Sequence, residues 1–326
     1  MKAGQTNEVM CLGEALVDLV SLEPGRGWKD TRDYRLAPGG AVCNVTVGLA
    51  RLGVKVGLIS KVGSDPFGQM MLDFLKNEGV DVSWICTTKE HLTALVLVAL
   101  DSRRNPSFFF YGTPGADRML EAEEISAEAF QGIKVFHFGT ISLSVEPVRS
   151  ATLRAIEMAE KAGALLSFDP NLRFHLWKDH RALKKISWSL IPKVDLIKLN
   201  QEELAFLTDT KELENGAETL IRNGAKIVVI TLGRKGAFFA TEKYQGSVPA
   251  FKFKPIDTTG AGDAFAGAMI AWLTRFSRVP PEKPEMVKAV RFANAFAGMS
   301  TLKLGAIDGL RSFSGIEKFL KENSAD

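Results

Sequence analysis

The stretch Asp257-Thr258-Thr259-Gly260-Ala261-Gly262-Asp263 decides how the rest of the chain is interpreted. It follows a polar loop and opens the apolar run at residues 264–273, so we expect it to begin a helix. Small residues at a helix start leave backbone N–H groups uncovered. These groups, together with the positive end of the helix dipole, form a site for a phosphate or another oxyanion.

Asp263 places a carboxylate beside this predicted anion site. A carboxylate does not bind an anion, but it can take the proton from a hydroxyl that attacks a phosphorus held there. The alternative for this stretch is a helix whose glycines serve tight turns and whose aspartates are caps. The rest of the chain has to distinguish the two.

Size and composition favour a large α/β unit. The chain has 326 residues, 46% of them hydrophobic, with a net charge of +3 and no long run of Lys or Arg. We therefore expect no nucleic-acid partner. No apolar run approaches a membrane span and residues 1–8 are polar, so we expect a soluble cytoplasmic protein without a membrane partner. The scattered cysteines predict neither a disulfide framework nor a zinc site: Cys11, Cys43 and Cys86.

Short β-branched runs alternate with longer amphipathic runs along most of the chain. Such alternation predicts an α/β fold with a mostly parallel central sheet flanked by helices. Ligands of such sheets bind at the carboxyl ends of the strands, where Asp169, Asn200 and Thr231 lie. The predicted strands are residues 9–12, 54–60, 134–138, 165–169, 196–199 and 227–231. The predicted helices are residues 41–52, 67–78, 148–162, 201–207 and 214–223.

Two segments, residues 16–36 and 91–115, break this alternation. They contain strand-like pieces at 17–22, 93–100 and 107–111 with no helix between them. We expect a small antiparallel sheet that stands off the main one and acts either as a lid or as an extra edge hairpin. Residues 1–326 are expected to form a single domain that includes this sheet.

The Pro38-Gly39-Gly40 turn precedes the helix predicted at residues 41–52. Its glycines let a ligand approach the backbone closely, and Asn44 lies one turn further on the same side. The alternative is an ordinary strand-to-helix turn with Asn44 as a cap or core amide. Glu14 and Asp18 follow the first strand, where carboxylates suit hydrogen bonds from sugar hydroxyls. For Glu14 we expect a solvated loop position instead.

Three strand ends carry weaker signals. Asn200 and Glu203 have capping-box spacing, which is compatible with a role near Mg²⁺ through water because Mg²⁺ keeps several waters. The segment at residues 231–236 suits either a phosphate loop or a plain hairpin turn. Arg173, after the strand that ends at Asp169, can pair with a phosphate through its forked guanidinium or remain a surface residue.

Several common sites are excluded by the motifs that the chain lacks. There is no G-x-x-x-x-G-K-[ST] loop and no H-R-D or D-F-G motif, so the P-loop and protein-kinase mechanisms do not apply. The four histidines show no metal-ligand spacing. His137, inside an apolar run, is expected to be a core residue.

With these motifs in this order, the chain resembles the ribokinase-like carbohydrate kinases, the PfkB family, from Gly13 to Gly305. The two signatures are residues 39–44 and 257–263. The resemblance implies a ribokinase-like three-layer fold with a small β-sheet lid over the sugar. It also implies phosphorylation of a hydroxymethyl group by ATP with Mg²⁺. Members often pair through their lids, which makes a homodimer the candidate assembly.

The resemblance also assigns roles to individual residues. The catalytic set is Asp263 as the base, Gly260, Ala261 and Gly262 as the anion hole, and Arg173. The sugar-binding set is Asp18, Gly39, Gly40 and Asn44. The nucleotide-binding set is Thr231, Gly233, Gly236 and Asn294. The N-x-x-E motif that supports Mg²⁺ is matched by Asn200 and Glu203. A loop pair for a monovalent cation, with K⁺ as the candidate, is matched by Asp257, Thr259, Ser300, Lys303, Gly305 and Gly309.

Within the family, the segments at residues 167–173 and 38–41 look like fructokinases. One departure concerns the lid, where fructokinases and 2-keto-3-deoxygluconate kinases usually carry Phe-Tyr-Arg and this chain has Phe110-Tyr111-Gly112. In sugar-acid kinases that Arg helps to hold a carboxylate. Its absence weakens the case for an acidic substrate and also loosens the fructokinase match. Arg103 or Arg104 could supply the charge from the neighbouring strand.

The sequence therefore predicts an ATP-dependent fructokinase in which Asp263 takes the proton of the sugar's 6-hydroxyl. Two alternatives stay open at this point. One is another kinase of the family, acting on 2-keto-3-deoxygluconate, ribose or a nucleoside. The other is a catalytically inactive relative that serves as a binding or scaffold protein, against which the intact Asp263, Gly260 and Gly262 argue.

Overall fold

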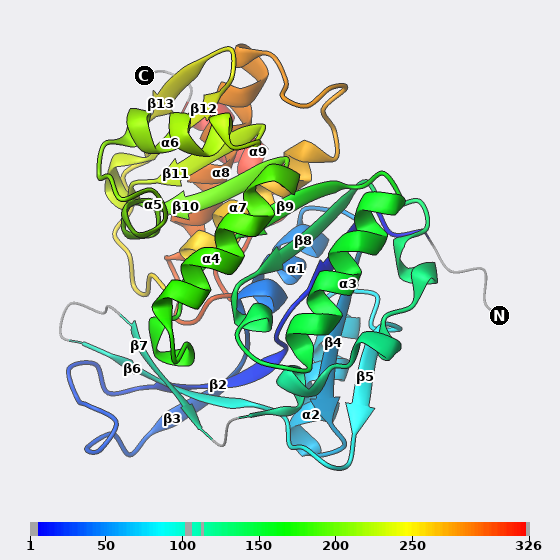
Figure 1. The fold of residues 1–326 in the computed structure, drawn as a ribbon. Helices are drawn as coiled ribbons and strands as arrows, with labels where there is room; N and C mark the ends of the chain where they lie inside the picture. Colours follow the sequence, from blue (N-terminus) through cyan, green and yellow to red (C-terminus); the bar gives the residue numbers. More distant parts are fainter. Residues whose placement is uncertain (1–5, 102–105, 112–113, 324–326) are drawn as a thin grey trace.

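The computed structural model describes residues 6–101, 106–111 and 114–323. Its main body is a sheet with the strand order β13-β12-β11-β10-β9-β8-β1-β4-β5 (Figure 1). Pairing is parallel from β11 to β5, and only β12 and β13 run antiparallel to their neighbours. The predicted mostly parallel central sheet is therefore confirmed. Its strands are β1 (Val9–Leu12), β4 (Val56–Gly63), β5 (Ile85–Thr88), β8 (Val135–Gly139), β9 (Leu165–Asp169), β10 (Leu196–Asn200), β11 (Ile227–Thr231), β12 (Ala237–Thr241) and β13 (Gln245–Val248).

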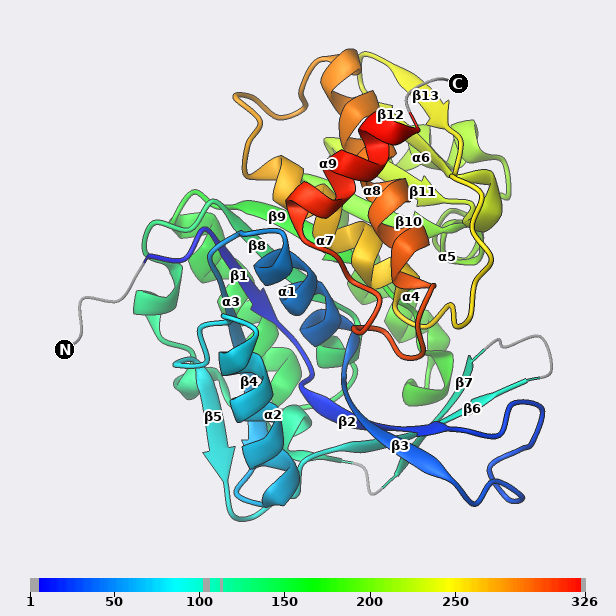
Figure 2. The ribbon, with the colours of Figure 1, turned by 180° about the vertical axis from the view of Figure 1, so that it is seen from behind.

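Helices cover both faces of this sheet. In Figure 1, α3, α4, α5 and α6 lie in front of it, and in Figure 2, seen from behind, α1, α2, α7, α8 and α9 cover the other face. The helices are α1 (Ala41–Arg51), α2 (Pro66–Asn77), α3 (Val148–Lys161), α4 (His180–Leu190), α5 (Gln201–Thr208), α6 (Leu213–Arg222), α7 (Ala261–Leu273), α8 (Lys283–Ser300) and α9 (Phe313–Glu322).

The two helical layers enclose two separate apolar cores. Successive residues of a strand point to opposite faces, so Val9 and Cys11 of β1 belong to the core with α1, α7 and α8. Met10 and Leu12 belong to the core with α3 to α6. All four residues are fully buried, which is why the strands read as continuous apolar runs in the sequence.

The second sheet has four strands in the order β3-β2-β6-β7 and stands apart from the main body, at the bottom of Figure 1. Its pairing corrects the prediction of an antiparallel sheet. β2–β3 and β6–β7 are antiparallel hairpins, but the central strands β2 and β6 are parallel. The sheet is mixed because the chain returns to the main body between the hairpins, so both leave it in the same direction. The strands are β2 (Leu16–Ser21), β3 (Tyr34–Gly39), β6 (Leu95–Leu100) and β7 (Pro106–Tyr111).

Cross-strand pairing gives this small sheet two different faces. One row of paired residues crosses the four strands on the side of the main body: Ala37, Asp18, Val96 and Phe110. The next row, on the opposite side, is entirely apolar: Leu36, Leu19, Leu97 and Phe109. Leu36 and Phe109 are 48% and 49% exposed, so the outer row presents apolar surface to solvent. Three lid residues on which the family comparison depends lie outside the described residues: Arg103, Arg104 and Gly112.

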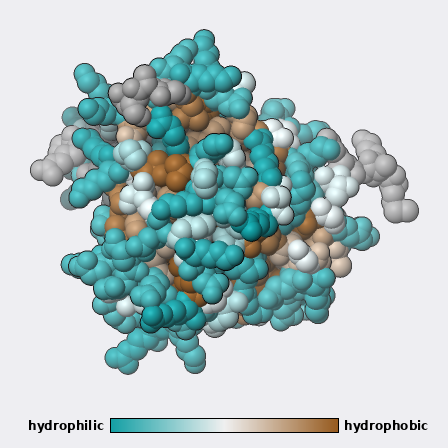
Figure 3. All heavy atoms as spheres, turned by 90° about the horizontal axis from the view of Figure 1, so that it is seen from above, coloured by the Kyte–Doolittle hydropathy of each residue, from teal (hydrophilic) through white to brown (hydrophobic). Residues whose placement is uncertain are grey.

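The surface composition and the buried polar residue His137 have features that are common in globular proteins. On the face in Figure 3, hydrophilic residues dominate and apolar residues form scattered groups. No helix within the described ranges has the length and apolarity needed to cross a bilayer.

His137 is a core residue, as predicted. Its Nδ1 lies 3.1 Å from Ser167 Oγ, and burial lowers the pKa of His137 to about 3.

Candidate active site

Two cavities meet at the N-terminus of α7. The larger, of about 340 Å³, lies between the main sheet and the lid and is lined by Asp18, Asn44 and Asp263 among others. The smaller, of about 200 Å³, lies beside α8. Thr231, Thr258 and Gly262 line both cavities. A group held at the first turn of α7 would therefore touch both spaces.

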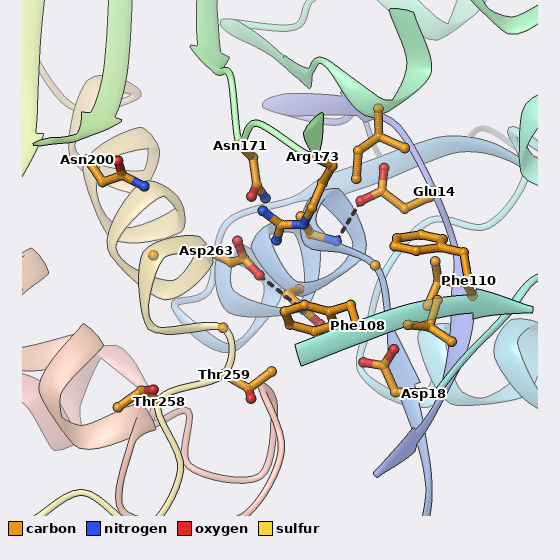
Figure 4. Close-up of a pocket in the computed structure, with 18 of the residues that line it drawn as sticks. Glu14, Asp18, Phe108, Phe110, Asn171, Arg173, Asn200, Thr258, Thr259 and Asp263 are labelled. Atoms are coloured by element: carbon orange, nitrogen blue, oxygen red, sulfur yellow. Dashed lines mark hydrogen bonds between the residues drawn. The ribbon is translucent and has the colours of Figure 1, made fainter. Parts of the chain in front are cut away.

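Asp263 lies in the first turn of α7 and faces the larger cavity (Figure 4). Its Oδ2 accepts a 2.8 Å hydrogen bond from Asn44 Nδ2 on α1. Burial raises the pKa of Asp263 to about 6, although this hydrogen bond and the nearby Lys198 and Arg173 oppose the rise. The carboxylate is thus oriented by a neutral donor and has a proton affinity suited to a base near neutral pH.

The first turn of α7 offers the backbone donors that the sequence predicts. The Ala261 N–H donates to Thr258 O at 3.2 Å, closing the turn. The amides of Gly260 and Gly262 have no hydrogen-bond partner among the described residues, and Gly262 lies at the junction of the cavities. Of the three predicted anion-hole residues, Gly260 and Gly262 therefore have backbone amides that are free to bind an anion, whereas the Ala261 amide is used in the turn.

The four predicted sugar-binding residues lie together on the other side of Asp263. Asp18 is 7% exposed and sits against Gly39, where a Cβ atom would lie 2.3 Å from Asp18 Oδ2. Burial, with the charges of Asp263 and Glu14, raises the pKa of Asp18 to about 7. Gly40 and Asn44 line the same cavity from the start of α1. The glycine at position 39 is required by this close approach of the Asp18 carboxylate.

The expected solvated position of Glu14 is wrong. Glu14 is 3% exposed, lines the larger cavity, and its Oε1 accepts a 2.6 Å hydrogen bond from the Ala41 N–H at the start of α1. An acidic side chain is stabilised there because the first amides of a helix lack backbone partners. Burial and the nearby Asp117 raise the pKa of Glu14.

Arg173 reaches the larger cavity from the loop after β9, so it is not an ordinary surface residue. Its guanidinium carbon lies 5.3 Å from the centre of the Phe108 ring of the lid, a cation–π arrangement. Figure 4 shows Asn171 and Arg173 both directed toward Asp263. The loop thus presents a positive charge to the space beneath the lid.

The predicted nucleotide-binding residues line the smaller cavity. Thr231 ends β11, and Gly233 and Gly236 bound the turn that leads into β12. Asn294 on α8 is buried, and its amide donates to the carbonyls of Val248 and Pro249 at 3.0 and 3.2 Å. Both amide hydrogens are therefore used to fix the loop after β13, which leaves the Asn294 side-chain oxygen for a ligand.

Asn200 and Glu203 form a complete capping box at the start of α5. Asn200 Oδ1 accepts from the Glu203 N–H, and Glu203 Oε2 accepts from the Asn200 N–H, each at 2.8 Å. Glu203 Oε1 accepts a further bond from the Leu172 N–H at 2.9 Å. Each carboxylate oxygen keeps one free acceptor direction. These residues fit a divalent cation held through water, and they do not form a direct ligand cage.

The predicted cation loops are tied together by a buried carboxylate. Asp257 Oδ1 accepts from the N–H and hydroxyl of Thr259 at 2.9 and 2.7 Å, and Oδ2 accepts from the Gly305 N–H at 2.8 Å. Gly309 packs against the Ser300 carbonyl, where a Cβ atom would lie 2.0 Å from the oxygen. Lys303 is exposed. Residues 257–259 and 300–309 are thus adjacent.

A lid residue also reaches these loops. Arg35 of β3 donates through Nη2 to Leu304 O at 2.8 Å and forms a 3.0 Å ion pair with Asp308 through Nη1. The lid is therefore linked directly to the C-terminal loop that Asp257 holds.

One charged residue of the larger cavity was not predicted from the sequence. Lys198 of β10 is 7% exposed and donates to Asp169 Oδ2 at 2.8 Å. Burial works against its charge, but Asp169 and Glu203 outweigh it and raise the pKa of Lys198. A lysine inside an apolar strand is rare enough to have been a signal in the sequence.

The inward-facing aromatics of the lid were missed as well. Phe108 and Phe110 of β7 line the larger cavity with Asn171, whose backbone adopts a left-handed φ of 42°. Asparagine is among the few residues that tolerate this conformation. Phe108, Phe109 and Phe110 are three consecutive aromatic residues, so the sequence shows no period-two alternation from which the inward-facing rings could be identified.

Comparisons with known proteins agree with this geometry. "Fructokinase-2" of Solanum lycopersicum is 37% identical over 320 residues, which cover 98% of each chain. The structure of fructokinase with bound ATP from Xylella fastidiosa superposes with a TM-score of 0.88 at 29% identity, covering 98% of this chain and 99% of that one. These matches confirm the predicted ribokinase-like three-layer fold.

A third relative carries ligands in its structure. The fructokinase of Vibrio cholerae O395, solved with fructose, ADP and a calcium ion, superposes with a TM-score of 0.87 at 35% identity over 97% of this chain and 99% of that one. A double mutant of that protein was solved with fructose, ADP and a potassium ion. The profile described as "pfkB family carbohydrate kinase" matches residues 6–312. The chain therefore belongs to the pfkB family of carbohydrate kinases and is an ATP-dependent carbohydrate kinase.

Proposed function

We propose that this kinase transfers the γ-phosphoryl group of ATP to the 6-hydroxyl of fructose. The observation that carries the proposal is the meeting of two cavities at the first turn of α7. Fructose occupies the larger one, under the lid, and ATP the smaller one. Gly262 and Thr258, at the junction, border the position at which the phosphoryl group passes from one to the other.

In this proposal Asp263 is the general base. It takes the proton of the 6-hydroxyl as the sugar oxygen attacks the γ-phosphorus. Asn44 donates to Oδ2 of Asp263, which orients the carboxylate and leaves Oδ1 for the substrate proton. Asp18, with Gly39 and Gly40 beside it, holds other hydroxyls of the sugar. The lid strands β2, β6 and β7 cover the sugar and exclude water, which would otherwise accept the phosphoryl group.

The charge that develops on the phosphoryl group is stabilised by groups that are fixed before the substrates bind. The amides of Gly260 and Gly262 and the dipole of α7 face the group, and Arg173 supplies a positive charge from the loop after β9. The nucleotide lies along Thr231, Gly233, Gly236 and Asn294. Donors that are already oriented avoid the cost of reorganisation during transfer.

Two further groups of residues are assigned to metal ions, one to Mg²⁺ and one to K⁺. Asn200 and Glu203 would hold Mg²⁺ through water molecules bound at the acceptor directions that the capping box leaves free. Bound with ATP, Mg²⁺ neutralises charge on the phosphate oxygens. The candidate K⁺ site is the loop pair that Asp257 ties together, in which several residues would bind through backbone carbonyls: Asp257, Thr259, Ser300, Lys303, Gly305 and Gly309.

The charges of the cavity support a neutral sugar over a sugar acid. Among the described lining residues, four carboxylates face two cations. Glu14, Asp18 and Asp263 cluster on the sugar side, and they would repel the carboxylate of 2-keto-3-deoxygluconate. Hydroxyl groups, in contrast, donate favourably to carboxylates.

Replacement of Asp263 by Asn tests the base. We expect kcat to fall on the order of 10²- to 10⁴-fold, because the amide cannot accept the proton. Fructose affinity, measured by calorimetry, should remain close to that of the wild type. Asp73→Asn on the exposed side of α2 is the control and should change neither quantity. An Asp263→Asn variant with half of the wild-type rate would exclude Asp263 as the base.

The pH dependence of kcat/KM gives a second test. A base must be deprotonated, so kcat/KM should fall as the pH drops through the Asp263 pKa of about 6. Asn44→Ala removes a hydrogen bond that lowers this pKa, so the acid limb should move to higher pH. Asn77→Ala, an exposed amide on α2, should leave the limb unchanged. A shift to lower pH in Asn44→Ala would contradict the assignment.

A substrate panel with a coupled ADP assay tests the sugar. Fructose, 2-keto-3-deoxygluconate, ribose and a nucleoside are compared at matched ATP and Mg²⁺. We expect kcat/KM for fructose to exceed the values for the other three substrates by at least about tenfold. The reason is that only a sugar with matching hydroxyl positions pairs all the polar groups of the cavity. Preference for the acidic sugar would overturn the fructose assignment. No ATP turnover with any sugar would favour the inactive scaffold.

We further propose that two copies pair through the outer faces of their lids. The row Leu36, Leu19, Leu97 and Phe109 is apolar across all four strands, and its two end residues are about half exposed. Tyr111, 63% exposed, adds an aromatic ring on the same side. A second copy of the same face would bury these side chains by a two-fold contact.

Analytical ultracentrifugation tests this assembly. We expect the wild type to sediment as a dimer, and Leu36→Glu and Phe109→Glu to sediment as monomers, because a charge buried in an apolar contact is left unpaired. Val287→Glu, at an exposed apolar position on α8 away from the lid, is the control and should remain dimeric. A monomeric wild type, or a dimer that survives both lid variants, would exclude the lid contact.

A further inference from the structure

Lys198 occupies an unusual position in the middle of β10. Its neighbours Ile197 and Leu199 are fully buried, and Lys198 itself is 7% exposed. Burying an ammonium group is costly, so lysine is almost never found in such a strand without a partner. Its side chain points to the same side of the strand as Asn200, toward the larger cavity.

The partner of Lys198 is Asp169, at the end of the adjacent strand β9. The Nζ–Oδ2 distance is 2.8 Å, and both side chains are almost fully buried. Asp169 Oδ1 has no hydrogen-bond partner in the part of the chain that the structure describes, so the pair is not completely satisfied there. A buried ion pair of this kind contributes little net stability, and an apolar pair would serve the fold as well. The fold alone does not explain the lysine.

The ammonium group lies next to the anion site of α7. A Cβ atom placed on Gly262 would be 3.1 Å from Lys198 Nζ, and Lys198 lines the same cavity as Gly260, Gly262 and Asp263. Lysine has three N–H donors, of which Asp169 accepts one. A donor and a positive charge are thus available at the point where the backbone amides of α7 face the cavity.

We propose that Lys198 is a catalytic residue that donates a hydrogen bond to the transferring phosphoryl group. The inference rests on the phosphoryl transfer proposed above. In that step the sugar oxygen forms a bond to the γ-phosphorus, and its proton passes to Asp263. The bond to the bridging oxygen breaks, and ADP keeps that electron pair. Lys198 is unchanged by the step and stabilises the charge on the phosphoryl oxygens from the sheet side, while Asp169 holds its side chain in place.

Two variants test this role together. Lys198→Met removes the ammonium group and leaves Asp169 unpaired, whereas the double variant Asp169→Asn/Lys198→Met removes both charges. If Lys198 acts on the phosphoryl group, kcat with fructose should fall on the order of 10²- to 10³-fold in both proteins. KM for fructose and the Kd of ADP should stay within about threefold, because neither ligand carries the transferring group. Lys193→Met, which removes an exposed lysine paired with Glu160, should behave as wild type.

The double variant separates catalysis from folding. If Lys198 had only a structural role, Lys198→Met would lower kcat because the buried Asp169 charge would lack its partner. The double variant removes that charge and would then recover most of the wild-type kcat. Such recovery, or a Lys198→Met protein within tenfold of the wild-type kcat, overturns the inference. If thermal melts show that Lys198→Met does not fold, the double variant decides alone. Failure of the proposed function is distinguished by the wild type, which would then not phosphorylate fructose in the same assay.

Discussion

The Asn44–Asp263 hydrogen bond joins the two helices on which the site depends. Asn44 lies in α1 and Asp263 in α7, and the helices pack closely because Gly267 of α7 sits against the backbone of α1. Each helix begins at the edge of the larger cavity, α1 with Gly40 and α7 with Gly260. If the two helices moved apart, the carboxylate would lose its orientation and both cavities would change shape together. The spacing of two helix starts is therefore the constraint on which the chemistry depends.

The larger cavity concentrates acidic groups that the described lining of the smaller cavity lacks. Glu14, Asp18 and Asp263 lie within one cavity, and burial raises the pKa of each. This arrangement costs folding free energy, since like charges repel and each carboxylate is desolvated. The protein offsets part of the cost with the amides at the start of α1, the Asn44 side chain and the positive Arg173 and Lys198. The presence of these acidic residues in the cavity is therefore explained by function and not by stability.

Much of the fold and part of the site follow from the sequence, and the reasons for the failures are specific. Strand–helix alternation is a local pattern, so the central sheet could be predicted, as could the α7 start. The mixed pairing of the lid could not, because it depends on how two hairpins meet in space. Glu14 was assigned to solvent because a short segment does not show that the start of α1 lies against it. Lys198 was overlooked because its place in the cavity beside Gly262 joins residues that are distant in sequence. The tie between Asp257 and Gly305 likewise joins loops far apart in the chain.

The alternation of residues in β2 has a consequence for how the lid can vary. Asp18 belongs to the row that faces the larger cavity, while Leu19 belongs to the row that faces away. Insertion or deletion of one residue between β1 and the middle of β2 would exchange these rows. The Asp18 carboxylate would then point outward and Leu19 would face the larger cavity, so one change would alter both faces of the lid. Substitutions can change the inner and outer faces independently, whereas a change in the length of β2 alters both faces at once.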